Sequence, residues 1–156
     1  MQAIGIIRTP FTSLEDMPIQ PKGAKGIHGT LIIDEQYAEG LADLDGFSHI
    51  FLIYQFHKAK RTALKVVPFM DTQQRGVYAT RSPLRPNHIG ISIVELINIE
   101  GCTITVEGID VLDKTPLFDI KPYIPAFDNV QESRSGWMQS SEKDVARKRS
   151  DHRFID

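Results

Sequence analysis

The sequence has 156 residues, of which 41% are hydrophobic and 24% charged, with a formal net charge of -2. This length fits one domain with a sizeable core and is too short for two independent domains. The charge balance excludes a uniformly basic nucleic-acid-binding surface, although it allows one concentrated basic pocket.

The start of the chain and its single cysteine bear on location. The first residues, MQAIGIIRTPF, have no basic flank and no small-residue cleavage site, so we expect no signal peptide. No apolar run approaches the roughly 18 residues that span a bilayer. Cys102 has no second cysteine to pair with, which fits a reducing compartment. These features favour a cytoplasmic protein.

Most of the secondary structure expected along the chain is β-strand. Early acidic residues and inward-facing leucines predict one short helix at residues 35–44, which Gly40 weakens. Many short strands with few helices predict an all-β, mainly antiparallel fold, a small closed or nearly closed barrel. Apolar alternation and β-branched runs predict strands at 3–8, 29–33, 49–57, 64–67, 76–80, 89–99 and 103–111.

Three of these strands have patterns that predict how they are covered. The segment IFLIYQF is apolar on both faces, which indicates a closed barrel or a subunit contact. In TITVEGIDV the alternation changes phase at Glu107 and Gly108, which predicts a β-bulge. Glu95 interrupts the apolar odd-numbered face of residues 91–99, so we expect partial exposure, a partner or a site on that side.

The composition changes near residue 128, which predicts a barrel domain at 1–128 and a polar tail at 129–156. A weak capping pattern starts a possible helix at Ser141, and the alternative is a loosely docked tail. The tail's basic side chains predict either contact with an RNA backbone or a solvated cluster. They are Arg147, Lys148, Arg149 and Arg153.

The stretch TRSPLRPNHIG places two arginines on a stiff connection. Pro83 and Pro86 bias the residues before them toward extended backbone, so Arg81 and Arg85 do not share a helix face. A fixed backbone lowers the entropy lost when a guanidinium binds phosphate or carboxylate. The stretch therefore predicts an anion-binding site, with surface salt bridges as the alternative.

Other candidate groups lie in two further segments. Asp113 and Asp119 in LDKTPLFDIKPY provide carboxylates that serve as bases, although turn formation also explains them. His57 ends an apolar strand, where sites are often built, and is a stronger candidate than His49. Two histidines without further ligands in register predict no metal site. Dinucleotide, P-loop and esterase motifs are absent from the sequence.

Several motifs in the same order resemble the TsaA-like family, whose characterised members are the TrmO methyltransferases. They are IGIIRTPF, DLDGFSHIFLIYQFHK, GVYATRSPLRPNHIGIS and VLDKTPLFDIKPYIPAFD, which together cover roughly residues 4–128. The resemblance implies a small β-barrel that forms homodimers and binds S-adenosylmethionine in a manner unlike Rossmann-type methyltransferases. It further implies methylation of the exocyclic nitrogen of threonylcarbamoyladenosine, next to the anticodon of tRNA.

The resemblance also implies site residues. We expect substrate contacts at Arg85 and Asn87, and a proton acceptor at Asp119 or Asp113, with His57 a lesser candidate. The family usually has other residues at Ile19, His88 and Lys114 (arginine, proline and glycine). Cofactor contacts are expected at Pro18, Ile19, Gln20, His57, Lys58, Arg81, Ile91, Asp113, Lys114, Thr115 and Pro116.

Two other functions remain open at this point. One is a module that binds S-adenosylmethionine, a nucleotide or RNA with the same barrel and without catalysis. The other is an enzyme of a different type, such as a hydrolase that uses Asp113 and Asp119, although no nucleophile motif supports it.

Overall fold

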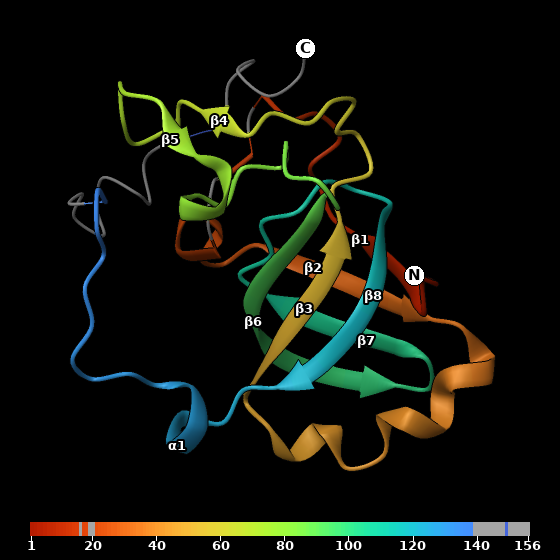
Figure 1. Ribbon diagram of the computed structural model, residues 1–156. Coiled ribbons are helices and arrows are strands. Elements are labelled where there is room, and N and C mark those ends of the chain that lie inside the picture. The colour runs from red at the N-terminus through yellow and green to blue at the C-terminus, as the bar shows by residue number, and fades with distance from the viewer. Residues whose placement is uncertain (16, 19–20, 139–148, 150–156) are drawn as a thin grey trace.

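A computed structural model describes residues 1–15, 17–18, 21–138 and 149. Within these residues, six antiparallel strands close into a barrel in the order β1-β2-β7-β6-β3-β8 (Figure 1). The expected all-β barrel is therefore confirmed. The strands are β1 (Gly5–Arg8), β2 (His28–Ile33), β3 (His49–Gln55), β6 (Ile89–Glu100), β7 (Thr103–Glu107) and β8 (Thr115–Pro122).

Short elements connect and cover the barrel strands. Strands β4 (Lys65–Val66) and β5 (Arg75–Gly76) form a separate two-stranded sheet. One short α-helix, α1 (Pro125–Asp128), follows β8. The described part of the chain also has four 3-10 helices: η1 (Pro21–Ala24), η2 (Glu35–Leu41), η3 (Leu44–Gly46) and η4 (Val77–Ala79).

The barrel encloses apolar side chains that alternate along the strands. In β3 the buried residues Ile50, Leu52 and Tyr54 alternate with half-buried Phe51 and Ile53. Burying one such aliphatic side chain contributes about 1.5–3 kcal/mol, so the closed barrel is the main source of stability. The other buried members of this core are Ile7, Leu31, Ile33, Val94, Ile104, Val106, Ile109, Val111 and Leu117.

Strand β8 was not expected from the sequence. It closes the barrel between β1 and β3, and Leu117 is fully buried there. Its pairing with β3 shifts register beside Ile53, and Asp119 and Lys121 lie opposite outward-facing residues of β3. The shift and these charges interrupt the apolar alternation, which hides the strand from a search by periodicity.

Local structure also differs from expectation at three other places. The strand predicted at 76–80 is wrong for most of its length, because residues 77–79 form the 3-10 helix η4. In place of one helix at 35–44, the chain forms the 3-10 helices η2 and η3, which are separated at Asp43 by a left-handed φ of 69°. At the phase change after β7, the strand ends at Glu107 and Gly108 turns with φ of 84°. All four apolar residues of this segment are buried as predicted, through a strand end in place of a bulge.

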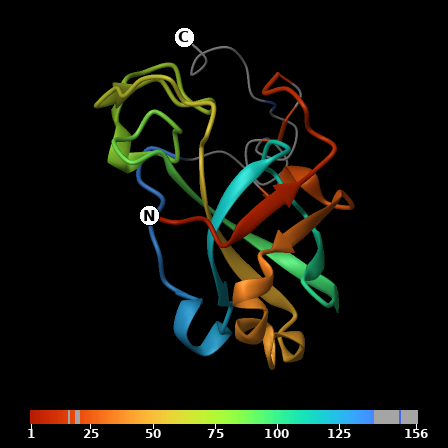
Figure 2. The same cartoon turned by 90° about the vertical axis from the view of Figure 1, so that its right-hand side faces the viewer.

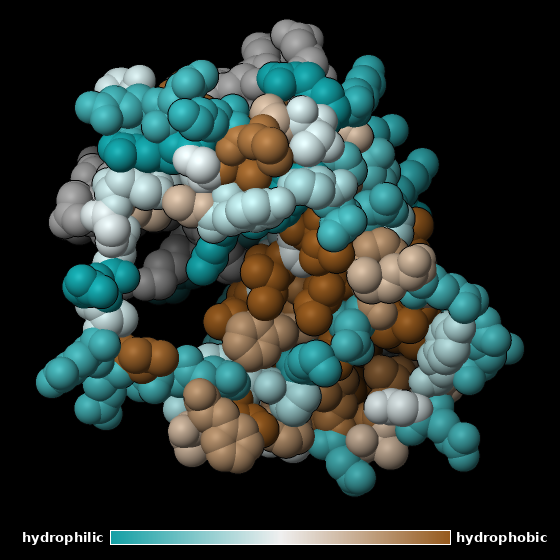
Figure 3. Space-filling model, viewed as in Figure 1, coloured by the Kyte–Doolittle hydropathy of each residue, from teal (hydrophilic) through white to brown (hydrophobic). Residues whose placement is uncertain are grey.

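Strand β6 presents its isoleucines outward. Its even-numbered residues Ser92 and Val94 are buried, whereas Ile91 and Ile93 are 48% and 38% exposed and Glu95 is exposed. Ile91 lies opposite Ile53, and Ile93 opposite Phe51, on the neighbouring strand β3. We call these four residues the isoleucine face. Figure 3 shows hydrophobic surface gathered over β3, β6 and β8 on this side of the molecule.

The two ends of the barrel are covered by different segments. Residues 56–88, which include β4 and β5, cover one end, and η2 and η3 lie at the opposite end (Figures 1 and 2). The first cover has its own small core of Val66, Val77 and Leu84. This core stiffens an otherwise irregular segment, because burial restricts the loops that carry it.

The beginning of the predicted tail packs against the first cover. The indole Nε1 of Trp137 donates a hydrogen bond to the Ala79 carbonyl at 2.7 Å, and the Arg75 guanidinium lies 5.8 Å from the indole ring centre. Residues 129–138 run back from α1 toward β4 and β5 (Figure 1). The helix predicted from Ser141, and Arg147, Lys148 and Arg153, lie outside the described residues. In the described part, no helix is long and apolar enough to cross a membrane.

Candidate functional site

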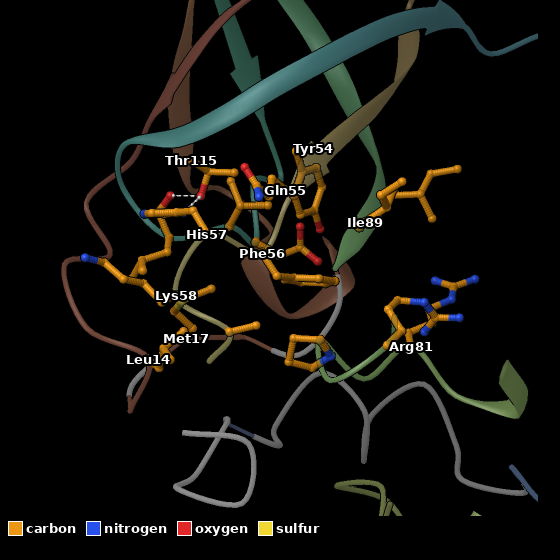
Figure 4. A pocket seen from close by; sticks show the side chains of 18 of the residues that line it. Leu14, Met17, Tyr54, Gln55, Phe56, His57, Lys58, Arg81, Ile89 and Thr115 are labelled. Atoms are coloured by element: carbon orange, nitrogen blue, oxygen red, sulfur yellow. Dashed lines mark hydrogen bonds between the residues drawn. The ribbon is translucent and has the colours of Figure 1, made fainter. Parts of the chain in front are cut away.

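A cavity of about 390 Å³ lies under residues 56–88 at one end of the barrel. This volume suits a small-molecule ligand. Its apolar wall includes Leu14, Met17, Phe56 and Phe69. Figure 4 shows His57 and Lys58 on one side of the cavity, Arg81 on the opposite side, and Tyr54 and Phe56 between them. The cavity therefore combines an apolar surface with cations on two sides.

A glycine at the start of β6 makes room for the aromatic floor of the cavity. A Cβ on Gly90 would lie 2.4 Å from the Tyr54 ring and 2.9 Å from the Phe56 ring. The two rings pack edge to face with centroids 5.6 Å apart. The absence of a side chain at Gly90 thus allows Tyr54 and Phe56 to take their places beside the cavity.

A chain of hydrogen bonds runs from the barrel interior to the cavity. Tyr54 Oη lies 2.9 Å from Ser92 Oγ, and Ser92 Oγ donates to Asp110 Oδ1 at 2.6 Å. Asp110 is only 9% exposed and lines the cavity. The chain joins β3, β6 and the segment after β7, so it fixes one carboxylate at the junction of three elements.

Burial changes the protonation of this chain. It raises the pKa of Asp110 to about 6, and the Ser92 hydrogen bond and the Arg81 charge oppose that rise. Burial also raises the pKa of Tyr54, with a further contribution from the Asp110 charge, so the phenol stays protonated. Asp110 is consequently a carboxylate whose proton affinity lies near physiological pH.

His57 and Thr115 meet beside the same cavity. Thr115 Oγ1 donates to the Leu112 carbonyl at 2.6 Å and makes a longer contact of 3.4 Å with His57 Nδ1 (Figure 4). Partial burial and the neighbouring Lys58 charge lower the pKa of His57. The imidazole is therefore neutral at pH 7, and Lys58 supplies the positive charge on this side.

The stretch around Arg81 and Arg85 is held by its own hydrogen bonds. Thr80 Oγ1 donates to the Val77 carbonyl, and Arg85 Nη1 donates to the carbonyls of Thr80 and Ser82 at 2.9 and 3.2 Å. Nη1 of Arg85 is thus engaged in hydrogen bonds within its own loop. Both arginines line the cavity, as expected of an anion-binding site.

The structure brings together many of the predicted site residues. The cavity wall does not include Asn87, Lys114 or Pro116. Asn87 and Lys114 are exposed. Ile19 and Gln20 lie outside the described residues. The predicted residues that line the cavity are Pro18, His57, Lys58, Arg81, Arg85, Ile91 and Thr115.

The two predicted proton acceptors lie elsewhere. Asp113 Oδ1 accepts hydrogen bonds from Arg8 Nε at 2.8 Å and from the Thr9 amide at 3.0 Å. The Arg8 hydrogen bond keeps the pKa of Asp113 below its usual range. Asp119 is half-exposed, lies opposite Ile53 on the outside of the barrel and is 3.6 Å from Lys121 Nζ. Neither carboxylate lines the cavity among the described residues, and their catalytic role stays a prediction.

Asp110 was missed by the sequence analysis. Its neighbours Ile109 and Val111 are both buried, so simple alternation places the aspartate on the outside. A polar residue at an inward position would have indicated it. Ser92 is such a residue in β6, and a buried hydroxyl needs a hydrogen-bond partner.

Two unusual residues occupy left-handed backbone near the site. Lys114 has φ of 66°, a conformation that favours glycine. His88 has φ of 51°, which a proline ring does not allow, and its Nδ1 lies 2.9 Å from the Pro83 carbonyl. The backbone at His88 therefore differs from that of a chain with proline at this position.

Comparison with known proteins identifies the barrel. Residues 6–129 match the family described as tRNA-methyltransferase O N-terminal domain. The chain belongs to this family. A crystal structure of TrmO from Pseudomonas aeruginosa has a TM-score of 0.73 and 38% identity to it, over 86% of this chain and 60% of that one. The chain thus shares the barrel of the solved TrmO protein and spans only part of its length.

Two relatives of this TrmO-family chain have descriptive names. A probable S-adenosyl-L-methionine-binding protein of Pyrococcus abyssi is 47% identical over 97% of this chain and 83% of its own length. The tRNA (adenine(37)-N6)-methyltransferase of Escherichia coli is 31% identical over 90% of this chain and 64% of its own length. The first name agrees with the cofactor expected from the sequence, and the second is that of a methyltransferase.

Proposed function

We propose that this chain is an S-adenosylmethionine-dependent tRNA methyltransferase that methylates the exocyclic nitrogen of threonylcarbamoyladenosine next to the anticodon. The observation that carries the proposal is the cavity, which combines aromatic and apolar walls, cations on opposite sides and a buried carboxylate in a TrmO-family barrel. Because tRNA is processed in the cytoplasm, the proposal includes that location.

The residues of the cavity fit the cofactor. Phe56, Phe69 and Met17 provide an apolar surface for an adenine ring, and Arg81 provides a fork of donors for a carboxylate. Asp110 is the one acidic side chain among the described residues that line the cavity, so it suits a cationic group. When bound, S-adenosylmethionine supplies an electrophilic methyl group on a sulfonium. The chain's own contribution is mainly positioning, because direct displacement needs an in-line approach.

Segregated charge supports an RNA substrate. Residues 56–90 contain seven Lys or Arg and one acidic residue, whereas residues 34–48 contain five acidic residues and no Lys or Arg. The first segment surrounds the cavity and the second lies at the opposite end of the barrel (Figure 1). A phosphate backbone is therefore attracted to the end that holds the cavity and repelled from the other.

A homodimer is part of the proposal, with the isoleucine face as its contact. Ile91 belongs both to this face and to the cavity wall, so a second copy seated there would lie beside the site. Light scattering after size exclusion tests this: Ile93→Asp should be monomeric. The control Ile32→Asp replaces an isoleucine that is 42% exposed on β2 and should stay dimeric. A monomeric wild-type protein at micromolar concentration contradicts the dimer.

A second candidate is a module that binds S-adenosylmethionine without catalysis. The relative from Pyrococcus abyssi, which this chain matches over nearly its whole length, is named only for binding. Incubating the protein with methyl-labelled S-adenosylmethionine and tRNA with or without threonylcarbamoyladenosine separates the candidates. Label in the modified tRNA alone supports the enzyme; binding without transfer supports the module.

A further inference from the structure

The cavity contains one carboxylate that the predicted assignments leave unused. Asp110 lines the cavity, is 9% exposed and is held by Ser92 at 2.6 Å. Burial disfavours the ionised form of this carboxylate, and carboxylates with such surroundings cluster at functional sites. The hydrogen bonds of Ser92 to both Asp110 and Tyr54 fix the direction of this carboxylate.

The proposed reaction needs a proton acceptor. The acceptor nitrogen carries one hydrogen before transfer and none afterwards, so a base must remove it during or directly after methylation. A base must lie within hydrogen-bond reach of the reacting atoms, which requires a side chain that lines the cavity. Asp113 is engaged by Arg8 and Asp119 lies on the outside of the barrel.

We propose that Asp110 accepts the proton from the acceptor nitrogen during methyl transfer, and that Ser92 and Tyr54 are positioning residues that hold its carboxylate. This inference rests on the proposed function. The nitrogen forms the new bond to the methyl carbon, and the carbon–sulfur bond breaks with its electron pair on sulfur. The N–H proton passes to Asp110, leaving neutral S-adenosylhomocysteine, and later leaves to solvent.

The surroundings of Asp110 suit this role. Its pKa of about 6 keeps it mostly ionised at pH 7.5 while making it a stronger base than an exposed aspartate. The buried Tyr54 phenol stays protonated and does not compete for the proton. The other charged or titratable side chains that line the cavity come from two loops: His57, Lys58, Arg81 and Arg85.

His57 is the alternative base within the cavity. Partial burial and the Lys58 charge lower its pKa, so the imidazole is neutral at pH 7 and able to accept a proton. If His57 were the base, the fall in rate at acidic pH would persist in a variant of Asp110. A profile therefore distinguishes the two side chains.

Asp110→Asn tests the inference through activity. We expect transfer to modified tRNA to fall by at least about 100-fold and the acid limb of the pH–rate profile to disappear, with S-adenosylhomocysteine affinity retained. Asp34→Asn, a change at an exposed aspartate far from the cavity, is the matched control and should keep the wild-type rate. A retained acid limb in Asp110→Asn, or its loss in Asp113→Asn or Asp119→Asn instead, overturns the assignment.

Ser92→Ala tests the same inference while keeping the carboxylate. The Ser92 hydrogen bond lowers the pKa of Asp110, so its removal should move the acid limb to higher pH. Carbon-13 NMR titration of the Asp110 carboxyl group in the free protein provides a readout without catalysis. It should show a pKa near 6 in the wild type and a higher one in Ser92→Ala.

The outcomes separate this inference from the proposed function. A wild-type protein that methylates no modified tRNA contradicts both. An active wild type with an ordinary aspartate pKa at Asp110, or with an unshifted profile in Ser92→Ala, contradicts the inference alone.

Discussion

The two ends of the barrel use the same strands for different purposes. At one end η2 and η3 cover the core with a strongly acidic, exposed segment. At the other end residues 56–88 form a second small core and leave a cavity between it and the barrel. A net charge of -2 thus conceals two ends of opposite sign, and the cavity lies at the basic end.

Arg81→Ala gives the largest expected effect on the basic end apart from the Asp110 variants. A charge-assisted hydrogen bond contributes about 1.5–3 kcal/mol, so affinity for S-adenosylmethionine or for tRNA should fall roughly 10- to 100-fold. Calorimetric titration and filter binding measure the two affinities, and Arg81→Lys should recover part of the loss. A change in thermal stability with both affinities intact would refute the assignment.

The pH dependence of stability tests the buried carboxylate at this end. The folded pKa of Asp110, about 6, exceeds the ordinary value of 3.8, so the wild type loses stability as pH rises from about 4 to 6. Asp110→Asn lacks this loss and should gain relative to the wild type by up to about 3 kcal/mol between pH 4 and 7. Urea unfolding at both pH values measures the difference. A constant difference would mean that Asp110 titrates normally.

Charge substitutions at each end test the proposal that the basic end faces RNA. Lys60→Gln with Lys65→Gln changes two exposed lysines outside the cavity wall. We expect weaker tRNA binding and a log–log salt slope reduced by up to about 2, because each lost phosphate contact reduces it by about 1. The matched pair Glu35→Gln with Asp45→Asn changes the acidic end and should leave the slope unchanged. If both double variants changed the salt slope equally, tRNA would not distinguish the basic end from the acidic end.

Lys114→Gly gives the smallest expected effect. Its backbone φ of 66° is strained for a side-chain-bearing residue, so glycine should stabilise the fold by about 1 kcal/mol. Because Lys114 is exposed and lies outside the cavity wall, cofactor affinity should not change. Urea unfolding and calorimetric titration measure the two quantities. A large loss of cofactor affinity would instead support the cofactor contact that the sequence predicts for Lys114.

Much of the fold and part of the site could be predicted from the sequence. The short apolar run of β3 and the β-branched residues of β6 indicated strands, because such residues favour extended backbone. The stiff loop with Arg81 and Arg85 was recognisable from its prolines and guanidinium groups. Both features depend on residues that are neighbours in the sequence, and both lie beside the cavity in the structure.

The remainder depends on contacts between distant residues. The surroundings of Asp110 come from Ser92, 18 residues before it in the chain, and from Tyr54, 38 residues before Ser92. Alternation alone also could not decide which face of β6 turns outward, because both faces are partly apolar. The hydrogen bond from Arg8 to Asp113, 105 residues apart in the chain, also could not be read from the sequence.

The most direct test of the central claim is a crystal structure of the protein with S-adenosylhomocysteine. We expect the ligand in the cavity at the basic end, with its amino-acid carboxylate bonded to Arg81 and its sulfur on the side of Asp110. A ligand bound at the acidic end or on the outer barrel surface, with the cavity left empty, would contradict this account.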